Sequence, residues 1–145
     1  MGQEITLSKF HQDWVEIADK GFADYDSLTR DERVWFNIQG LIGDVGNGGL
    51  ISHYFNSGAD KNGETIEDLN FLGQKEIAGI LERINKLFPG GHVSKDIDER
   101  NDIISNWPDG QHDDLLKDLD NEFYGREKDL ELRLIKHIKE KGLCK

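Results

Sequence analysis

A glycine-rich break between two apolar patches, within residues 38–58, constrains the fold of this chain more than any other feature. The first patch has the spacing of one buried helical stripe and consists of Ile38, Leu41, Ile42 and Val45. The glycine-rich segment 46–49 follows, and the second patch then begins at once with Leu50, Ile51, Tyr54 and Phe55. Glycine permits positive φ angles and close backbone approach, so the break predicts a helix that ends and turns sharply into another.

The side chains at this corner are expected to be structural. Asn47 belongs to the residue types that cap helix N-termini, so we predict that it caps the helix beginning near Leu50. Asp44 is expected to accept hydrogen bonds from nearby backbone N–H groups. The predicted structural motif consists of Asp44, Asn47, Gly48, Gly49, Tyr54 and Phe55.

Apolar residues recur at helical spacing along the whole chain, and no long segment alternates with period two. Thr29 and Glu32 form a capping-box pattern that opens the helix of the first patch. Near the end of the chain, the pattern predicts one helix ending around Phe123-Tyr124 and another over residues 130–138. A chain of 145 residues buries about two-thirds of its unfolded surface. We therefore expect one all-α domain over residues 1–145, with seven or eight helices and no significant sheet.

The corner also carries a family resemblance. Residues 44–58 read D-V-G-N-G-G-L-I-S-H-Y-F-N-S-G. This segment resembles the signature of a bacterial family of unknown function that includes an acidic DNA-mimic protein. Similar residues occur at 28–33, 71–78 and 119–124, whereas Gly46 stands where the family more often has asparagine. The resemblance implies an all-helical fold and binding to a DNA-binding protein.

Negative charge is the strongest compositional signal. The chain has 29 Asp and Glu residues against 18 Lys and Arg residues, a net charge of −11. Residues 96–122 hold ten acids and two bases, whereas residues 126–145 hold four acids and seven bases. A negative field repels nucleic acid and acidic membranes and attracts basic protein surfaces. A solvated acidic face that only keeps the protein soluble is the plainer interpretation of the same charge.

Two carboxylate pairs in the acidic stretch have a spacing that suits a helix surface. Asp98 and Asp102 are four residues apart, as are Asp114 and Asp118. This spacing places their Cβ atoms about 5–6 Å apart, comparable to the step between phosphates on one strand. Arg100 and Asp120 are predicted to form an ion pair between two helices. The candidate partner-binding residues are Asp98, Asp102, Asp109, Asp113, Asp114, Asp118, Asp120 and Glu122.

The residue types that usually act in catalysis or metal binding form no recognisable site in the sequence. The five histidines are scattered, without the three or four converging ligands that a metal ion needs. Residues 60–63 resemble part of a calcium loop, but its frame puts Leu69 where a carboxylate is required. We expect no catalytic residue, no metal and no cofactor.

Three hypotheses for function follow. The first is a non-enzymatic, acidic protein-binding module that acts as a DNA mimic on a basic partner such as a transcription regulator. The second is an immunity-type inhibitor of a toxin nuclease. The third is an enzyme with a site near Asp44, Asn47 and His53, at the Asn47-Gly48-Gly49 corner. In the first two, the chain binds a basic DNA-binding or nuclease protein and no nucleic acid directly.

Cysteine usage and hydropathy favour a cytoplasmic protein. Cys144 is the single cysteine and cannot form an internal disulfide. No apolar run approaches the ~18 residues of a membrane span, so no membrane contact is expected. The exposed acidic patch and the helical faces are also compatible with a homodimer.

Overall fold

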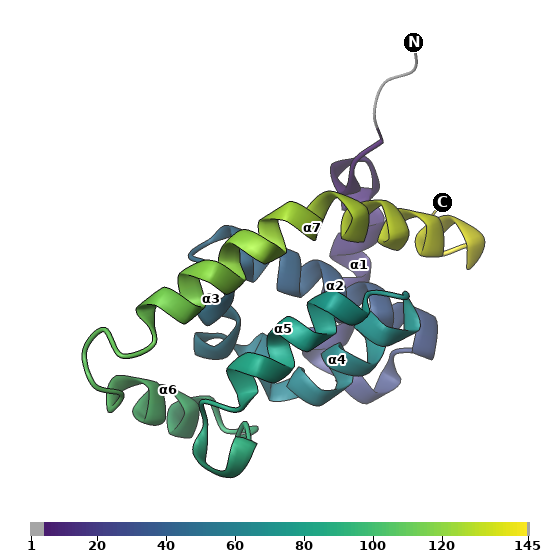
Figure 1. Ribbon diagram of the computed structural model, residues 1–145. Coiled ribbons are helices and arrows are strands. Elements are labelled where there is room, and N and C mark those ends of the chain that lie inside the picture. Colours follow the sequence, from purple (N-terminus) through teal and green to yellow (C-terminus); the bar gives the residue numbers. More distant parts are fainter. Residues whose placement is uncertain (1–4, 145) are drawn as a thin grey trace.

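The computed structural model describes residues 5–144, which form helices and the loops between them (Figure 1). This described range holds seven α-helices and no strand, which confirms the predicted all-α class. The α-helices are α1 (His11–Ala23), α2 (Arg30–Gly46), α3 (Leu50–Phe55), α4 (Asn62–Phe71), α5 (Lys75–Asn85), α6 (Ile97–Ser105) and α7 (Asp113–Glu140). The short 3-10 helices are η1 (Leu7–Phe10), η2 (Tyr25–Ser27), η3 (Ser57–Lys61) and η4 (Pro89–Gly91). Among the helices of residues 5–144, none combines the length and apolar character needed to cross a bilayer.

Helix α2 is the centre of the core. It contacts α1, α3, α4 and α7. Its apolar stripe is buried and consists of Val34, Trp35, Ile38, Leu41 and Val45. The predicted capping box is present, because Thr29 Oγ1 accepts the Glu32 N–H at 3.2 Å and Glu32 Oε1 accepts the Thr29 N–H at 2.9 Å. Both the start of α2 and its buried face therefore follow from the sequence.

The end of the chain differs from the prediction of two helices. Helix α7 is a single helix of 28 residues that continues through Gly125 and spans the molecule (Figure 1). A glycine inside a helix costs only about 1 kcal/mol relative to alanine. The buried stripe on both sides of Gly125 offsets that cost, and it consists of Leu119, Phe123, Leu130, Leu134 and Ile138.

The corner between α2 and α3 turns as predicted, but Asn47 does not cap α3. Asn47 lies in the right-handed helical region at the end of α2, and Gly49, with a φ of 86°, occupies the N-cap position of α3. The Leu50 N–H donates instead to Asp120 Oδ1 of α7 at 2.8 Å. The positive φ favours glycine at this position, and a Cβ there would also lie 2.7 Å from Asp120 Oδ2 and displace that carboxylate.

The two aromatic residues of the predicted motif take different positions. Tyr54 is buried, and its hydroxyl donates to Asn85 Oδ1 at 2.7 Å and lies 3.1 Å from the carbonyl oxygen of Leu81. Phe55 is 40% exposed. Phe55, which the sequence groups with the second apolar patch, therefore lies at the exposed edge of that patch. Successive helix residues point about 100° apart, and the core covers only the Tyr54 side of the short helix α3.

Candidate functional site

The acidic stretch forms one end of the molecule. It consists of α6, the loop 106–112 and the start of α7, which lie together at the end opposite the C-terminus (Figure 1). Asp96 opens this region by capping α6, since its Oδ1 accepts the Asp98 N–H at 2.9 Å and the Glu99 N–H at 3.4 Å. We call the surface of residues 96–118 the acidic end.

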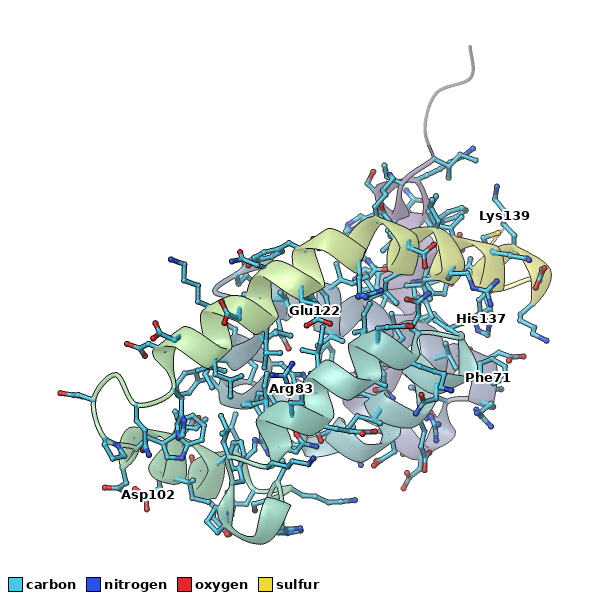
Figure 2. All side chains as sticks on the ribbon, in the orientation of Figure 1. Phe71, Arg83, Asp102, Glu122, His137 and Lys139 are labelled. Atoms are coloured by element: carbon cyan, nitrogen blue, oxygen red, sulfur yellow. The ribbon has the colours of Figure 1, made fainter. Side chains whose placement is uncertain are left out.

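Six of the eight candidate residues present exposed carboxylates at the acidic end. Asp98 and Asp102 lie on α6, and Asp114 and Asp118 lie on α7, so both predicted pairs have helical spacing. The Asp102 side chain lies on the outer side of this end (Figure 2). The other two exposed carboxylates belong to the loop and to the first turn of α7, and they are Asp109 and Asp113.

The remaining two candidates are already engaged within the protein. Asp120 is half-buried and caps α3 through the Leu50 N–H, so its role is structural. Glu122 lies 4.0 Å from Arg83 of α5 and 3.9 Å from Arg126 of α7 (Figure 2). Because these long, exposed ion pairs partly neutralise Glu122, we leave both residues out of the candidate surface.

The predicted ion pair between Arg100 and Asp120 is wrong. Arg100 is fully buried and turns towards α3 and η3, where its Nη1 lies 2.8 Å from Asp60 Oδ1. The guanidinium also donates to three backbone carbonyl oxygens, which are those of Tyr54 (3.0 Å), Ser94 (2.8 Å) and Asn56 (2.9 Å). A buried arginine needs this many acceptors, and the backbone at the end of α3 and in the segment before α6 supplies them.

Burial of Arg100 changes the charge that a partner meets at the acidic end. The stretch 96–122 holds two bases, Arg100 and Lys117. Arg100 is buried beside the carboxylate of Asp60, which comes from outside the stretch. Within described residues 96–122, Lys117 is thus the only exposed base.

At the corner named by the enzymatic hypothesis, both Asp44 and His53 lie next to Gly58. A Cβ at Gly58 would lie 3.0 Å from Asp44 Oδ2 and 3.4 Å from His53 Nδ1, so a larger residue at this position would crowd both groups. The Asp44 carboxylate accepts from Asn56 Nδ2 at 3.4 Å, and not from the backbone N–H groups that we expected. Asn47 is exposed at the end of α2.

Burial shifts both titratable groups of this corner towards their neutral forms. It raises the pKa of Asp44 to about 6, against a small opposing effect of the Asn56 hydrogen bond. It also lowers the pKa of His53 to about 3, and the charge of Arg100 adds to this effect. His53 is therefore a neutral, buried side chain at pH 7, with its Nε2 atom 3.2 Å from Asn62 Nδ2.

Asp44→Asn is expected to stabilise the protein at neutral pH. A carboxyl with a folded pKa of about 6 and an ordinary value of 3.8 contributes stability below the lower value, and this contribution is lost as the pH rises through 6. Asparagine is neutral throughout and retains an acceptor for Asn56. After a discount for solvent access, we expect a gain of about 1 kcal/mol in the free energy of unfolding at alkaline pH.

Urea denaturation at two pH values measures this effect. The gain should be present near pH 8 and should disappear near pH 4, where Asp44 is protonated in the wild type. Asp118→Asn, which changes an exposed carboxylate, serves as the control. A gain that is equal at both pH values would show that the Asp44 charge is not its cause.

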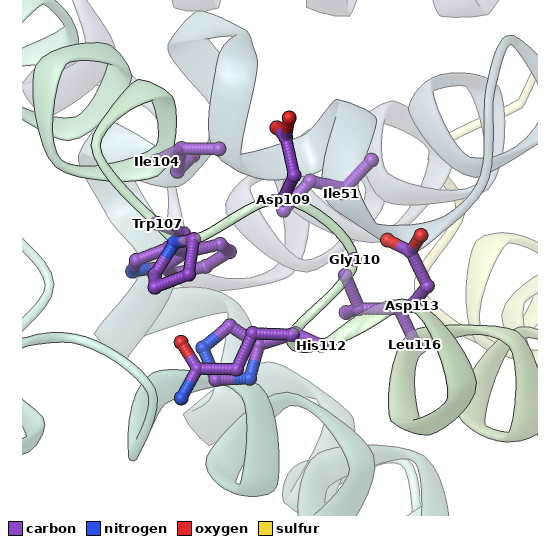
Figure 3. A pocket seen from close by; sticks show the side chains of 10 residues that line it. Ile51, Ile104, Trp107, Asp109, Gly110, His112, Asp113 and Leu116 are labelled. Carbon is purple, nitrogen blue, oxygen red and sulfur yellow. The ribbon is translucent and has the colours of Figure 1, made fainter.

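The loop before α7 encloses a hollow that the sequence analysis did not predict (Figure 3). Its volume is about 270 Å³, and both apolar and acidic side chains line it. The only sequence signal is an aromatic residue placed directly before a turn, at Trp107-Pro108-Asp109-Gly110. In residues 5–144, the lining of the hollow included, no group of three or more His, Cys, Asp or Glu side chains is arranged to hold a metal ion.

Comparison with known proteins shows the family of the chain. A family model described as DMP19-like protein matches residues 26–141. Neither the curated proteins nor the solved structures gave a match. The matched range includes the α2–α3 corner and every exposed carboxylate of the acidic end. The chain therefore belongs to the DMP19-like protein family.

Proposed function

We propose that this protein is a non-enzymatic binding module that acts as a DNA mimic. Its acidic end would occupy the nucleic-acid-binding surface of a basic protein such as a transcription regulator. The observation that carries the proposal is the group of exposed carboxylates at one end, six of which are candidate residues. They are accompanied within described residues 96–122 by a single exposed base, Lys117. The resemblance of the corner to a family with a DNA-mimic member supports it.

The spacing of these carboxylates suits side chains that bind phosphates. About half to two-thirds of the hydrogen bonds between proteins and DNA go to phosphate and sugar groups, largely from arginine and lysine. Asp98 and Asp102 on α6, and Asp114 and Asp118 on α7, offer carboxylates about 5–6 Å apart at their Cβ atoms. Arginine and lysine side chains spaced to bind successive phosphates can therefore bind these carboxylates instead.

The geometry of the corner favours this function over the enzymatic hypothesis. His53 is neutral and only 1% exposed. A general base must reach the proton that it abstracts, which requires room for a substrate within hydrogen-bond distance. The carboxylates of the acidic end are exposed and accessible to a partner.

Removing four carboxylates of the acidic end is expected to weaken binding to basic proteins at low salt. The end variant combines Asp98→Asn, Asp102→Asn, Asp114→Asn and Asp118→Asn. The control variant removes four exposed charges elsewhere, through Asp19→Asn, Asp26→Asn, Glu76→Gln and Glu82→Gln. Both variants have the same net charge, so a difference between them reports where the charge lies.

The experiment first uses this protein to capture a partner from a bacterial lysate. The captured protein is then identified, purified and titrated with each variant. We expect the wild type and the control variant to bind a DNA-binding protein with an affinity that falls as salt rises. The end variant should bind that protein at least about tenfold more weakly. Equal weakening in both variants would mean that net charge alone, and not the acidic end, attracts basic proteins.

A further inference from the structure

The hollow at the acidic end is lined by both apolar and acidic side chains. Its apolar surface comes from four half-buried side chains, Ile51 of α3, Ile104 of α6, Leu116 of α7 and Trp107 of the loop. Asp109 and Asp113 also line the hollow, and both are exposed (Figure 3). A hollow with this lining combines a surface for an aliphatic chain with two acceptors for a cation.

Ring contacts hold the aromatic wall in place, and the two carboxylates lie close to it in sequence and in space. The Trp107 ring packs against Phe88 at a centroid distance of 5.4 Å and against His112 at 4.8 Å, both edge to face. Asp113 Oδ2 lies 3.6 Å from the point that a Cβ of Gly110 would occupy, so its carboxylate rests against the turn that carries Asp109. The two acids therefore lie beside the same turn.

We propose that this hollow binds one arginine side chain of the basic partner. The aliphatic stem of the arginine would lie on Ile51, Ile104 and Leu116, and its guanidinium would reach Asp109, Asp113 and the Trp107 ring. This inference rests on the proposed function and names the side chain that anchors the partner. None of the four residues changed in the end variant lines the hollow.

The size and lining of the hollow suit one long, amphipathic side chain. Its volume of about 270 Å³ is below the ~300–1,000 Å³ of pockets that hold small-molecule ligands. Arginine and lysine place their methylene groups on apolar surface while the charged group stays at a polar opening. An apolar side chain would bury the same surface but would leave Asp109 and Asp113 partly desolvated and unpaired.

The lining also favours arginine over lysine. The planar guanidinium can donate two parallel hydrogen bonds to one carboxylate, and it stacks on aromatic rings. Trp107 is the aromatic residue type that attracts cations most strongly. Arginine in a well-packed pocket is a frequent energetic hot spot of interfaces, so this contact is expected to contribute more than the separate surface carboxylates.

NMR titration of the full chain with three short peptides tests the inference. The peptides are acetyl-Gly-Arg-Gly-amide, the same peptide with lysine, and the same peptide with citrulline, an uncharged isostere of arginine. We expect the arginine peptide to shift the Trp107 indole N–H and the methyl signals of Ile51, Ile104 and Leu116 in a saturable manner. The citrulline peptide should bind about tenfold more weakly and the lysine peptide several-fold more weakly.

Two neighbouring substitutions provide a matched control. Asp113→Asn and Asp114→Asn each remove one exposed charge from the first turn of α7, but only Asp113 lines the hollow. We expect Asp113→Asn to weaken the arginine peptide about tenfold and Asp114→Asn to change its affinity by less than about twofold. Equal effects of the two substitutions, equal binding of citrulline and arginine, or no shift at the hollow would each overturn the inference.

Failure of this inference is distinguishable from failure of the proposed function. If the hollow binds no arginine, the end variant should still lose its partner while the control variant retains it. If the proposed function fails, the end and control variants should behave alike in capture, whatever the peptides do at the hollow.

Discussion

Replacing Arg100 with methionine is expected to lower the free energy of unfolding by about 3–5 kcal/mol. Arg100 is 0% exposed, and its guanidinium joins α6 to the end of α3 and to η3. Methionine fills much of the volume but donates no hydrogen bond. The substitution therefore leaves three carbonyl oxygens without their donor and Asp60 without its ion-pair partner.

Arg83→Met is the control for this substitution. Arg83 is exposed on α5, and its contact with Glu122 is a 4.0 Å ion pair, so its loss should cost less than about 1 kcal/mol. Urea denaturation measures both variants, and hydrogen exchange should show faster opening of α6 in Arg100→Met. A cost for Arg100→Met as small as that for Arg83→Met would contradict the structural role described for Arg100.

Asp68→Ala is expected to destabilise the protein by a similar amount, about 3–5 kcal/mol. Asp68 is fully buried on α4 and binds Arg33 of α2 through two hydrogen bonds, of 2.6 Å to Nη2 and 3.2 Å to Nε. It also accepts from Asn37 Nδ2 at 2.9 Å. Alanine would leave the partly buried Arg33 and the buried Asn37 without this acceptor, at the contact between α2 and α4.

The neighbouring residue provides a matched control for Asp68. Glu67 has a side chain that is 67% exposed and lies 3.5 Å from the same Arg33 Nη2 atom. Because exposed ion pairs contribute little, Glu67→Ala should change the free energy of unfolding by less than about 1 kcal/mol. Thermal and urea denaturation of both variants would measure the difference, and similar costs would argue that burial is not what makes Asp68 important.

Local patterns in the sequence were sufficient to predict much of the fold. The apolar spacing of Ile38, Leu41 and Val45 predicted the buried face of α2, and the Thr29–Glu32 box predicted its start. Both signals lie within one or two turns of helix. The glycines before Leu50 likewise predicted a sharp turn, since Gly49 has the positive φ that such a turn uses.

Contacts between distant segments were not predicted, because they depend on how the helices pack. Asp120 caps α3 although it lies 70 positions from Leu50 in the sequence. Asn47 is of a residue type that caps helices, but it lies at the end of α2 and not at the N-cap position of α3. Asp120 directly follows the buried Leu119, so it lies at the edge of the buried stripe of α7 and can reach Leu50. In the sequence, Arg100 lies within an acidic helix and looks like an exposed base. Only the structure shows the carbonyl groups that surround it and make its burial possible.

For the candidate site, sequence spacing predicted the carboxylates but not the hollow. Asp98, Asp102, Asp114 and Asp118 lie on helices with the predicted spacing, and all four are exposed. The hollow needs side chains from α3, α6, α7 and the intervening loop, which only the tertiary structure brings together. That the carboxylates act as a binding surface stays a prediction.

Competition with DNA tests the proposed function most directly. A purified partner is first bound to a fluorescent DNA duplex, and this protein is then added while fluorescence anisotropy reports the bound DNA. We expect the wild type and the control variant to release the DNA completely, and we expect the end variant to leave it bound. A complex in which the partner holds DNA and this protein together would contradict DNA mimicry by the acidic end.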